Sequence, residues 1–253
     1  MKTKTDNFFQ NKHLFGGDIF HEGSKDVGIL LIHGFTATTV EVGILAEHFR
    51  EAGFTVSAPL LPGHGTSPYD LNHKRYLDWI NKVTASFHQL QKSFSTILVG
   101  GESMGAVLTL YLAVKYPQID AIYLFSPALL VKKLKYTFLM QHLNPIMDKN
   151  LPEDGLPWQG YTVYPTKAAY QFHKLTRLVR KSLSQVKSPT LIFQGRLDKT
   201  IDPENIDYIY RKISSNIKDT MWLDSSGHVL LLDNELSKII NRIEGFNTTN
   251  QIL

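Results

Sequence analysis

The chain contains no cysteine, so disulfide bonds, thiolate metal sites and a cysteine nucleophile are all excluded. It lacks an apolar run long enough for a membrane-spanning helix, and no apolar stretch follows the lysines of its N-terminus. A large excess of one charge is also absent, since the formal net charge is +4. These absences predict a cytoplasmic protein that neither inserts stably into a membrane nor binds nucleic acid.

Hydrophobic residues make up 43% of the 253 residues, which is enough to bury one sizeable core. Short β-branched runs alternate with longer helical patterns along the chain. This alternation is typical of an α/β protein with a mostly parallel sheet and helices on both faces. Neither an internal repeat nor a low-complexity linker divides the sequence, so residues 1–253 are predicted to form a single domain.

Residues 101–105 read Gly-Glu-Ser-Met-Gly and lie between a short apolar run, 96–100, and a helical pattern, 106–113. A Gly-x-Ser-x-Gly sequence between a strand and a helix is typical of a nucleophile elbow. The sharp reversal strains the backbone at the serine and leaves no room for Cβ atoms two residues to either side, which explains both glycines. Ser103 is therefore the candidate nucleophile.

A serine nucleophile needs a histidine base and a carboxylate that orients it, in the chain order serine, acid, histidine. Asp198 follows the apolar run 189–195, and parallel sheets place functional loops at the carboxyl ends of such strands. His228 follows the last short strand and is the predicted base. Asp202 is the alternative acid, but its place before Pro203 explains it as the N-cap of a helix.

The apolar run 28–32 opens into a His-Gly-Phe turn. Acyl transfer needs backbone N–H groups that point at the developing negative oxygen, an oxyanion hole. The predicted donors are the amides of Phe35, in this turn, and Met104, directly after the nucleophile. His33 is an alternative candidate for a catalytic histidine, but we interpret its ring as a structural group that hydrogen-bonds neighbouring backbone and shapes the turn.

In order and spacing the chain resembles the α/β-hydrolase superfamily, through His33-Gly34-Phe35, Pro62-Gly63-His64-Gly65, Gly101 to Gly105, Asp198 and Gly227-His228. It is similar to the bacterial carboxylesterase and monoacylglycerol lipase group through Leu61 to Ser67, Asp78-Trp79, the Glu102-Ser103-Met104 core and Ser226 to Val229. This resemblance implies the α/β-hydrolase fold and hydrolysis of small-molecule esters without a metal or cofactor. Ala106 departs from the group, which usually has a third glycine there.

Residues 128–186, here called the insert, interrupt the alternation of strands and helices. The insert lies between the strand predicted at 119–125 and the strand before Asp198, and it carries no β-branched run that would extend the sheet. We expect it to form a cap over Ser103 that excludes water and supplies an apolar acyl pocket. The candidate lining residues are its aromatic and apolar side chains, Tyr136, Phe138, Leu139, Met140, Trp158, Tyr161, Tyr164 and Phe172.

Besides the helical pattern 106–113, three more helices are predicted outside the insert. Thr38 followed by Glu41 resembles a capping box at the start of the first. The second is a long helix over 69–94, and the third is expected over 203–213.

Short to medium acyl esters, monoacylglycerols included, are the expected substrates. A serine aminopeptidase is the alternative, because Asp148, Glu153 and Asp154 could hold a substrate amine. A thioesterase or a non-enzymatic binding protein on the same fold are others. The only notable basic run, Lys132, Lys133 and Lys135, is a solvated surface or a contact to an anionic interface. The oligomeric state does not follow from the sequence.

Overall fold

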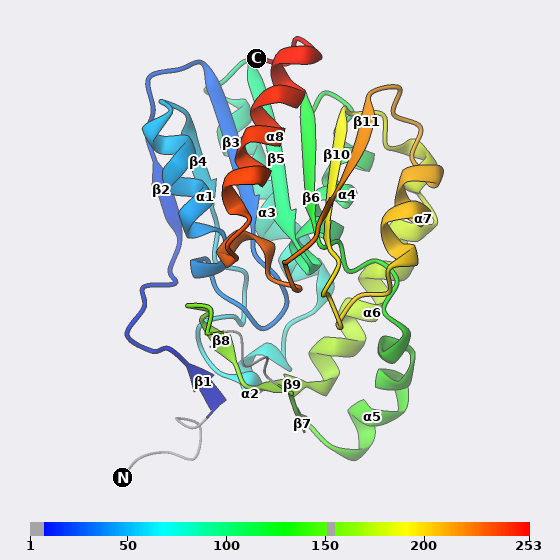
Figure 1. Cartoon of the computed structure of the whole chain (residues 1–253). Helices are drawn as coiled ribbons and strands as arrows, with labels where there is room; N and C mark the ends of the chain where they lie inside the picture. The colour runs from blue at the N-terminus through cyan, green and yellow to red at the C-terminus, as the bar shows by residue number, and fades with distance from the viewer. Residues whose placement is uncertain (1–7, 151–154) are drawn as a thin grey trace.

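The computed structural model describes residues 8–150 and 155–253, and its centre is a twisted seven-stranded sheet (Figure 1). The strand order is β11-β10-β6-β5-β3-β4-β2, and every neighbouring pair is parallel except β2 and β4. The strands are β2 (Ile19–His21), β3 (Val27–Ile32), β4 (Thr55–Ala58), β5 (Thr96–Glu102), β6 (Ala121–Phe125), β10 (Thr190–Gly195) and β11 (Lys218–Leu223).

Both faces of the sheet are buried, because alternate residues of its strands enter two separate apolar clusters. Along β3, for example, Leu30 and Ile32 face one cluster while Ile29 and Leu31 face the other. The helices α1 (Val40–Glu51) and α8 (Leu236–Thr249) cover one face, and α3 (Tyr76–Gln91) and α4 (Met104–Lys115) cover the other. The predicted α/β class with helices on both faces is confirmed.

The register of the central strands brings three chain reversals to one edge of the sheet. Ile32 of β3 pairs with Gly101 of β5, and Glu102 of β5 pairs with Phe125 of β6. The residues that follow these strands therefore leave the sheet side by side, at its carboxyl edge. This edge is where the predicted functional residues lie.

The insert lies beyond this carboxyl edge, below the sheet in the view of Figure 1. Its elements are η2 (Lys132–Tyr136), α5 (Thr137–Leu143), β7 (Ile146–Asp148), β8 (Gly160–Tyr161), β9 (Val163–Pro165), α6 (Thr166–Arg180) and η3 (Leu183–Gln185). Its short strands pair outside the central sheet: β7 with β9, and β8 with β1 (Phe9–Gln10) near the N-terminus.

The prediction of one long helix over 69–94 is wrong in one respect, because this segment forms two helices. These are α2 (Pro68–Leu71) and α3, which begins at Tyr76. Arg75 has extended backbone angles, and its amide donates to the Asp78 carboxylate at 2.7 Å. This local cap starts a new helix where the apolar pattern alone predicts a continuous one. The helix predicted over 203–213 is α7 (Glu204–Lys212).

Within the residues described here, no helix is long and apolar enough to cross a bilayer.

Candidate active site

Ser103 lies in a strained turn between β5 and α4. Its backbone angles are φ 57° and ψ −111°, a conformation that non-glycine residues adopt rarely. A Cβ at Gly105 would lie on the carbonyl oxygen of Ile32, and one at Gly101 would lie on the backbone of Gly105. Both glycines are thus required by close packing, as the sequence predicts for a nucleophile elbow. The turn presents the Ser103 side chain at the carboxyl edge of the sheet.

The structure brings His228 and Asp198 to Ser103 across long sequence separations. His228 Nε2 lies 3.0 Å from Ser103 Oγ, and His228 Nδ1 lies 2.8 Å from Asp198 Oδ2. The carboxylate of Asp198 also accepts hydrogen bonds from the side chain of Gln194 and the amides of Thr200 and Ile201, at 2.7 to 3.0 Å. A chain of hydrogen bonds therefore runs from a buried carboxylate through an imidazole to a hydroxyl.

The electrostatics of Asp198 suit a carboxylate that orients a histidine. Burial by itself would raise the pKa of Asp198, but the adjacent His228 and the two backbone amides outweigh burial and hold that pKa below its usual value. Asp198 is therefore ionised at neutral pH. An ionised partner at Nδ1 keeps the proton on that nitrogen and leaves Nε2 free to accept the serine proton.

The alternative acid, Asp202, is not brought to His228. Its carboxylate pairs with Lys132 and accepts from the amide of Glu204 at 3.3 Å, at the beginning of α7. The predicted N-cap position is wrong by one residue, because Pro203 is the N-cap of α7 and Asp202 precedes it. Lys132 is accordingly paired, and Lys135 lies over the ring of Tyr136 with its Nζ 4.9 Å from the ring centre.

The His-Gly-Phe turn after β3 lies directly against the nucleophile. A Cβ at Gly34 would lie 3.2 Å from Ser103 Cβ and 2.9 Å from Glu41 Oε2, so a larger residue there would have to displace the Glu41 carboxylate. The ring of Phe35 packs against Phe172 of α6, with ring centres 5.6 Å apart. The turn that carries one predicted oxyanion donor, Phe35, is thus next to the residue that carries the other, Met104.

His33 is a structural residue, as interpreted from the sequence. Its Nδ1 lies 2.9 Å from the carbonyl oxygen of Gly34, and its Nε2 accepts from the amide of Leu61 at 3.0 Å. Complete burial lowers the pKa of His33 to about 4, so the ring is neutral and carries its proton on Nδ1. Both ring nitrogens are occupied by backbone, which leaves none for acid-base work at Ser103.

Glu102 is a site residue that sequence reasoning missed. It precedes the nucleophile, is fully buried, and accepts hydrogen bonds from the amide of Leu230 and, at 3.4 Å, from that of Leu231. These amides belong to the segment just after His228, so Glu102 joins the nucleophile turn to the histidine loop. The resemblance of the Glu102-Ser103-Met104 core gave no sign of this bond, because the Gly-x-Ser-x-Gly pattern describes the turn and not the distant loop that contacts it.

Glu41 is the second residue whose role in the site was missed. The sequence predicts it in a capping box, and that prediction is wrong. The residue before α1 is Thr39, which makes no capping hydrogen bond through its side chain, and Glu41 does not close a capping box. Instead Glu41 Oε2 accepts from the Gly34 amide at 2.5 Å, while Oε1 accepts from Trp158 Nε1 at 3.3 Å. The one available signal was a charged residue on the apolar face of a helix.

The candidate lining residues of the insert divide into two groups. Tyr136, Phe138 and Leu139 are each more than half exposed, so solvent covers most of their surface. Met140, Trp158 and Tyr164 are partly buried, while Tyr161 and Phe172 are buried. Tyr161 has a structural role, because its hydroxyl donates to the carbonyl oxygen of Gly63 at 2.7 Å and accepts from the amide of Thr66.

No cluster of three or more histidine and carboxylate side chains that would hold a metal ion occurs in residues 8–150 or 155–253. Of the acidic residues considered for binding a substrate amine, Asp148 is exposed at the end of β7. Glu153 and Asp154 lie outside the described residues.

Comparison with known proteins identifies the family. Residues 23–160 and 157–235 match the sequence profile of the family described as serine aminopeptidase, S33. The chain is 34% identical over 234 residues to the thermostable monoacylglycerol lipase of Bacillus sp. (strain H-257), covering 90% of this chain and 93% of that protein. It is 28% identical over 218 residues to a carboxylesterase of Bacillus subtilis (strain 168), covering 83% and 87%.

Solved structures agree with this result. A structure from work on LipS and LipT, two metagenome-derived lipolytic enzymes, superposes with a TM-score of 0.88 at 30% identity, covering 92% of this chain and 98% of the other. The monoacylglycerol lipase of Paleococcus ferrophilus superposes with a TM-score of 0.76 at 19% identity, covering 93% and 99%. The second likeness supports the fold alone.

Proposed function

The chain belongs to the α/β-hydrolase family described as serine aminopeptidase, S33, and is a carboxylic ester hydrolase, and we propose that it works through a Ser103-His228-Asp198 triad. The observation that carries this proposal is the unbroken chain of hydrogen bonds from Ser103 Oγ to His228 to Asp198, at 3.0 and 2.8 Å. These distances are within the range for proton transfer between a nucleophile and its base.

In the first half-reaction, Ser103 Oγ attacks the ester carbonyl carbon while its proton passes to His228 Nε2. The negative charge that develops on the carbonyl oxygen is stabilised by the amides of Phe35 and Met104. When this tetrahedral intermediate collapses, the bond to the alkoxy oxygen breaks, and His228 returns the proton to the departing alcohol. Asp198 holds the imidazole in one tautomer and stabilises the imidazolium that forms between the two transfers.

In the second half-reaction, water takes the place of the alcohol. His228 removes a proton from water, the hydroxide attacks the acyl-enzyme carbonyl, and collapse releases the carboxylic acid as Ser103 regains its proton. The insert acts as a cap over this chemistry. Among its candidate lining residues, Trp158 and Tyr164 are the partly buried aromatic side chains, and we assign the lining of the acyl pocket to them. Each half-reaction balances without a metal or an oxidant.

We infer that the substrates are esters of short to medium acyl chains, monoacylglycerols among them. The relative that is 34% identical is named a monoacylglycerol lipase, and the candidate lining residues are aromatic and apolar. Each buried methylene contributes up to about 0.8 kcal/mol, so kcat/KM is expected to rise over the first acyl carbons and to fall when the pocket is full. Trp158→Ala or Tyr164→Ala should then shift the chain-length optimum without abolishing turnover.

The test combines active-site labelling with a substrate panel. The parent should react with a fluorophosphonate probe and hydrolyse p-nitrophenyl esters and monoacylglycerols faster than amino-acid p-nitroanilides or acyl thioesters. Ser103→Ala and His228→Ala should stay folded and lose about 10⁴-fold or more in kcat. A folded Ser103→Ala variant with near-parental esterase activity would refute the triad. Amides cleaved faster than every ester would instead favour the aminopeptidase alternative.

A further inference from the structure

The carboxyl group of Glu41 is buried in a place where packing alone would favour an apolar side chain. Glu41 is 4% exposed, and the other buried residues of α1 are Val42, Leu45, Ala46 and Phe49. A buried carboxyl group is costly unless donors compensate for its lost hydration, and its burial raises the pKa of Glu41 against the effect of the Gly34 amide. The two donors that compensate here are the Gly34 amide and the Trp158 indole.

These two donors belong to different parts of the fold, the turn beside the nucleophile and the insert. Gly34 directly precedes Phe35 in the turn that lies against Ser103, whereas Trp158 belongs to the insert. Glu41 therefore links the insert to the turn that carries a proposed oxyanion donor. The Phe35 N–H shares a rigid peptide plane with the Gly34 carbonyl, whose oxygen lies 2.9 Å from His33 Nδ1. Because Glu41 holds the N–H of Gly34 and His33 holds its carbonyl, both peptide planes that flank Gly34 are fixed, and with them the direction of the Phe35 N–H.

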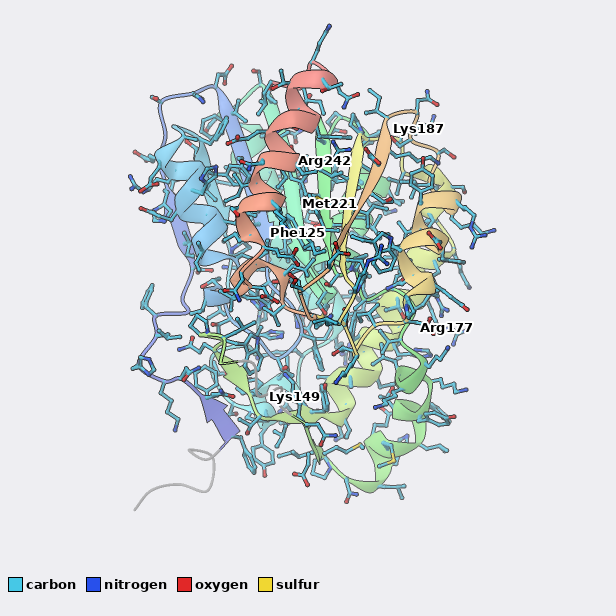
Figure 2. All side chains as sticks on the ribbon, viewed as in Figure 1. Phe125, Lys149, Arg177, Lys187, Met221 and Arg242 are labelled. Atoms are coloured by element: carbon cyan, nitrogen blue, oxygen red, sulfur yellow. The ribbon has the colours of Figure 1, made fainter. Side chains whose placement is uncertain are left out.

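The far side of Phe35 is also held by the insert. The carbonyl oxygen of Thr36 accepts from the Tyr161 amide at 2.8 Å, and its hydroxyl accepts from Lys149 Nζ at 3.2 Å. Lys149 lies in the insert, below the sheet in the view of Figure 2, with its Nζ 4.0 Å from the ring centre of Trp158. Thr36 has a φ of 67°, a strained conformation that persists only where surrounding contacts impose it.

We propose that Glu41 is a positioning residue that aligns the Phe35 amide for oxyanion stabilisation, and that its bond to Trp158 makes this alignment depend on the seating of the insert. This inference rests on the proposed function, because it takes Phe35 as an oxyanion donor. The catalytic contribution of Glu41 is made in the transition state rather than in substrate binding. Its loss should therefore lower kcat and leave KM almost unchanged.

The test compares two replacements that differ in hydrogen-bonding capacity at similar length. Glu41→Met has no acceptor for the Gly34 amide and should lose about 10- to 100-fold in kcat, less than the loss of a whole oxyanion donor. Glu41→Gln keeps one carbonyl oxygen for Gly34 and should retain kcat within about 5-fold of the parent. KM should change less than about 3-fold in both.

A transition-state analogue separates positioning from general stability. A trifluoromethyl ketone forms a hemiketal with Ser103 whose oxygen occupies the oxyanion hole, so its Ki should rise by the same factor by which kcat/KM falls. The matched control is Asn72→Ala. Asn72 also joins the insert to the rest of the fold, through Pro145 at 2.6 Å and Ala168 at 3.1 Å, but it does not contact the oxyanion turn. This control should keep parental kcat and Ki even if its melting temperature falls.

Trp158→Phe removes the indole N–H and keeps an aromatic ring, and it should lower kcat about 2- to 5-fold. In the double variant with Glu41→Gln the losses should be less than multiplicative, because both changes act on one hydrogen bond. These near-isosteric variants keep the test decisive should Glu41→Met fail to fold: their Ki values must still follow kcat/KM.

The positioning role is overturned if Glu41→Met is folded and has parental kcat, if the loss falls on KM alone, or if Asn72→Ala loses as much. It is also overturned if Ki for the ketone stays constant across the Glu41→Gln and Trp158→Phe series. Failure of the proposed function looks different, because Ser103→Ala would then remain active. An inactive Ser103→Ala beside a fully active Glu41→Met would reject the positioning role alone.

Discussion

The side chain of Glu102, the residue before the nucleophile, accepts a hydrogen bond from the amide of Leu230, two residues after His228. The two residues are 128 positions apart in the sequence. This contact joins the turn of the nucleophile to the loop of the proposed base, so the relative position of Ser103 and His228 depends on it.

Removing the acceptor at residue 102 should therefore loosen the histidine loop. Glu102→Gln keeps a carbonyl oxygen for Leu230 and is expected to stay within about 3-fold of parental kcat. Glu102→Leu leaves a buried amide without its partner and should lose about 10- to 100-fold in kcat, because small displacements of a catalytic group are costly. Steady-state kinetics on folded protein checks this; equal activity of the two variants would contradict it.

Glu102 should also make stability depend on pH. Burial, reinforced by the nearby Glu41, raises the pKa of Glu102 well above its ordinary value of 4.5. The folded state then keeps a proton that the unfolded state releases above about pH 4.5, so the stability that Glu102 contributes falls as pH rises toward its folded pKa. Glu102→Gln cannot lose this proton.

Urea unfolding of the parent and Glu102→Gln at several pH values between 5 and 8 measures the effect. The free energy of unfolding of the variant should gain on that of the parent by about 1 kcal/mol or more across this range. Groups that titrate equally in both proteins cancel in the difference. A constant difference across the range would show that Glu102 titrates normally in the fold.

The proposed acid can be separated from its neighbour by two matched substitutions. Asp198→Asn should lower kcat by about 10⁴-fold, because an amide at this position favours the wrong tautomer of His228. Asp202→Asn should remain within about 2-fold of the parent, since it loses only a contact to the exposed Lys132. Kinetics and circular dichroism on both variants check this, and the reverse ranking would assign the acid role to Asp202.

Local packing predicts opposite effects for substitutions at two glycines, one at the elbow and one in α8. Gly105→Ala would place its Cβ on the Ile32 backbone and should destabilise the fold by about 3 kcal/mol, with loss of esterase activity. Gly245 lies inside α8 with open space around the position of its Cβ. Gly245→Ala should stabilise by about 0.5 to 1 kcal/mol with unchanged kcat. Denaturant midpoints of both variants test the contrast.

The sequence by itself determined the features that depend on short-range patterns. The alternation of the strands from β3 to β6 with their helices, the strained turn at Ser103 and the structural bonding of His33 to its neighbour Gly34 all follow from residues close together in the chain. The edge strand β2 and the helix α8 were not predicted. The break between α2 and α3 was harder to predict. The start of α3 depends on one hydrogen bond from the Arg75 amide to the Asp78 side chain, whereas the apolar pattern continues through this position.

Tertiary structure alone decided where the buried carboxyl groups find their partners. The sequence predicts Glu41 in a capping box, yet it bonds Gly34 and, 117 residues away, Trp158. Sequence patterns assigned Glu102 no role beyond its place in the nucleophile motif, yet it holds the segment after His228. The exposure of Tyr136 and Phe138 was equally hidden. The physical reason is that packing of distant segments decides both which side chains stay in solvent and which donors reach a buried carboxyl group, which must be satisfied by whichever donors the fold brings to it.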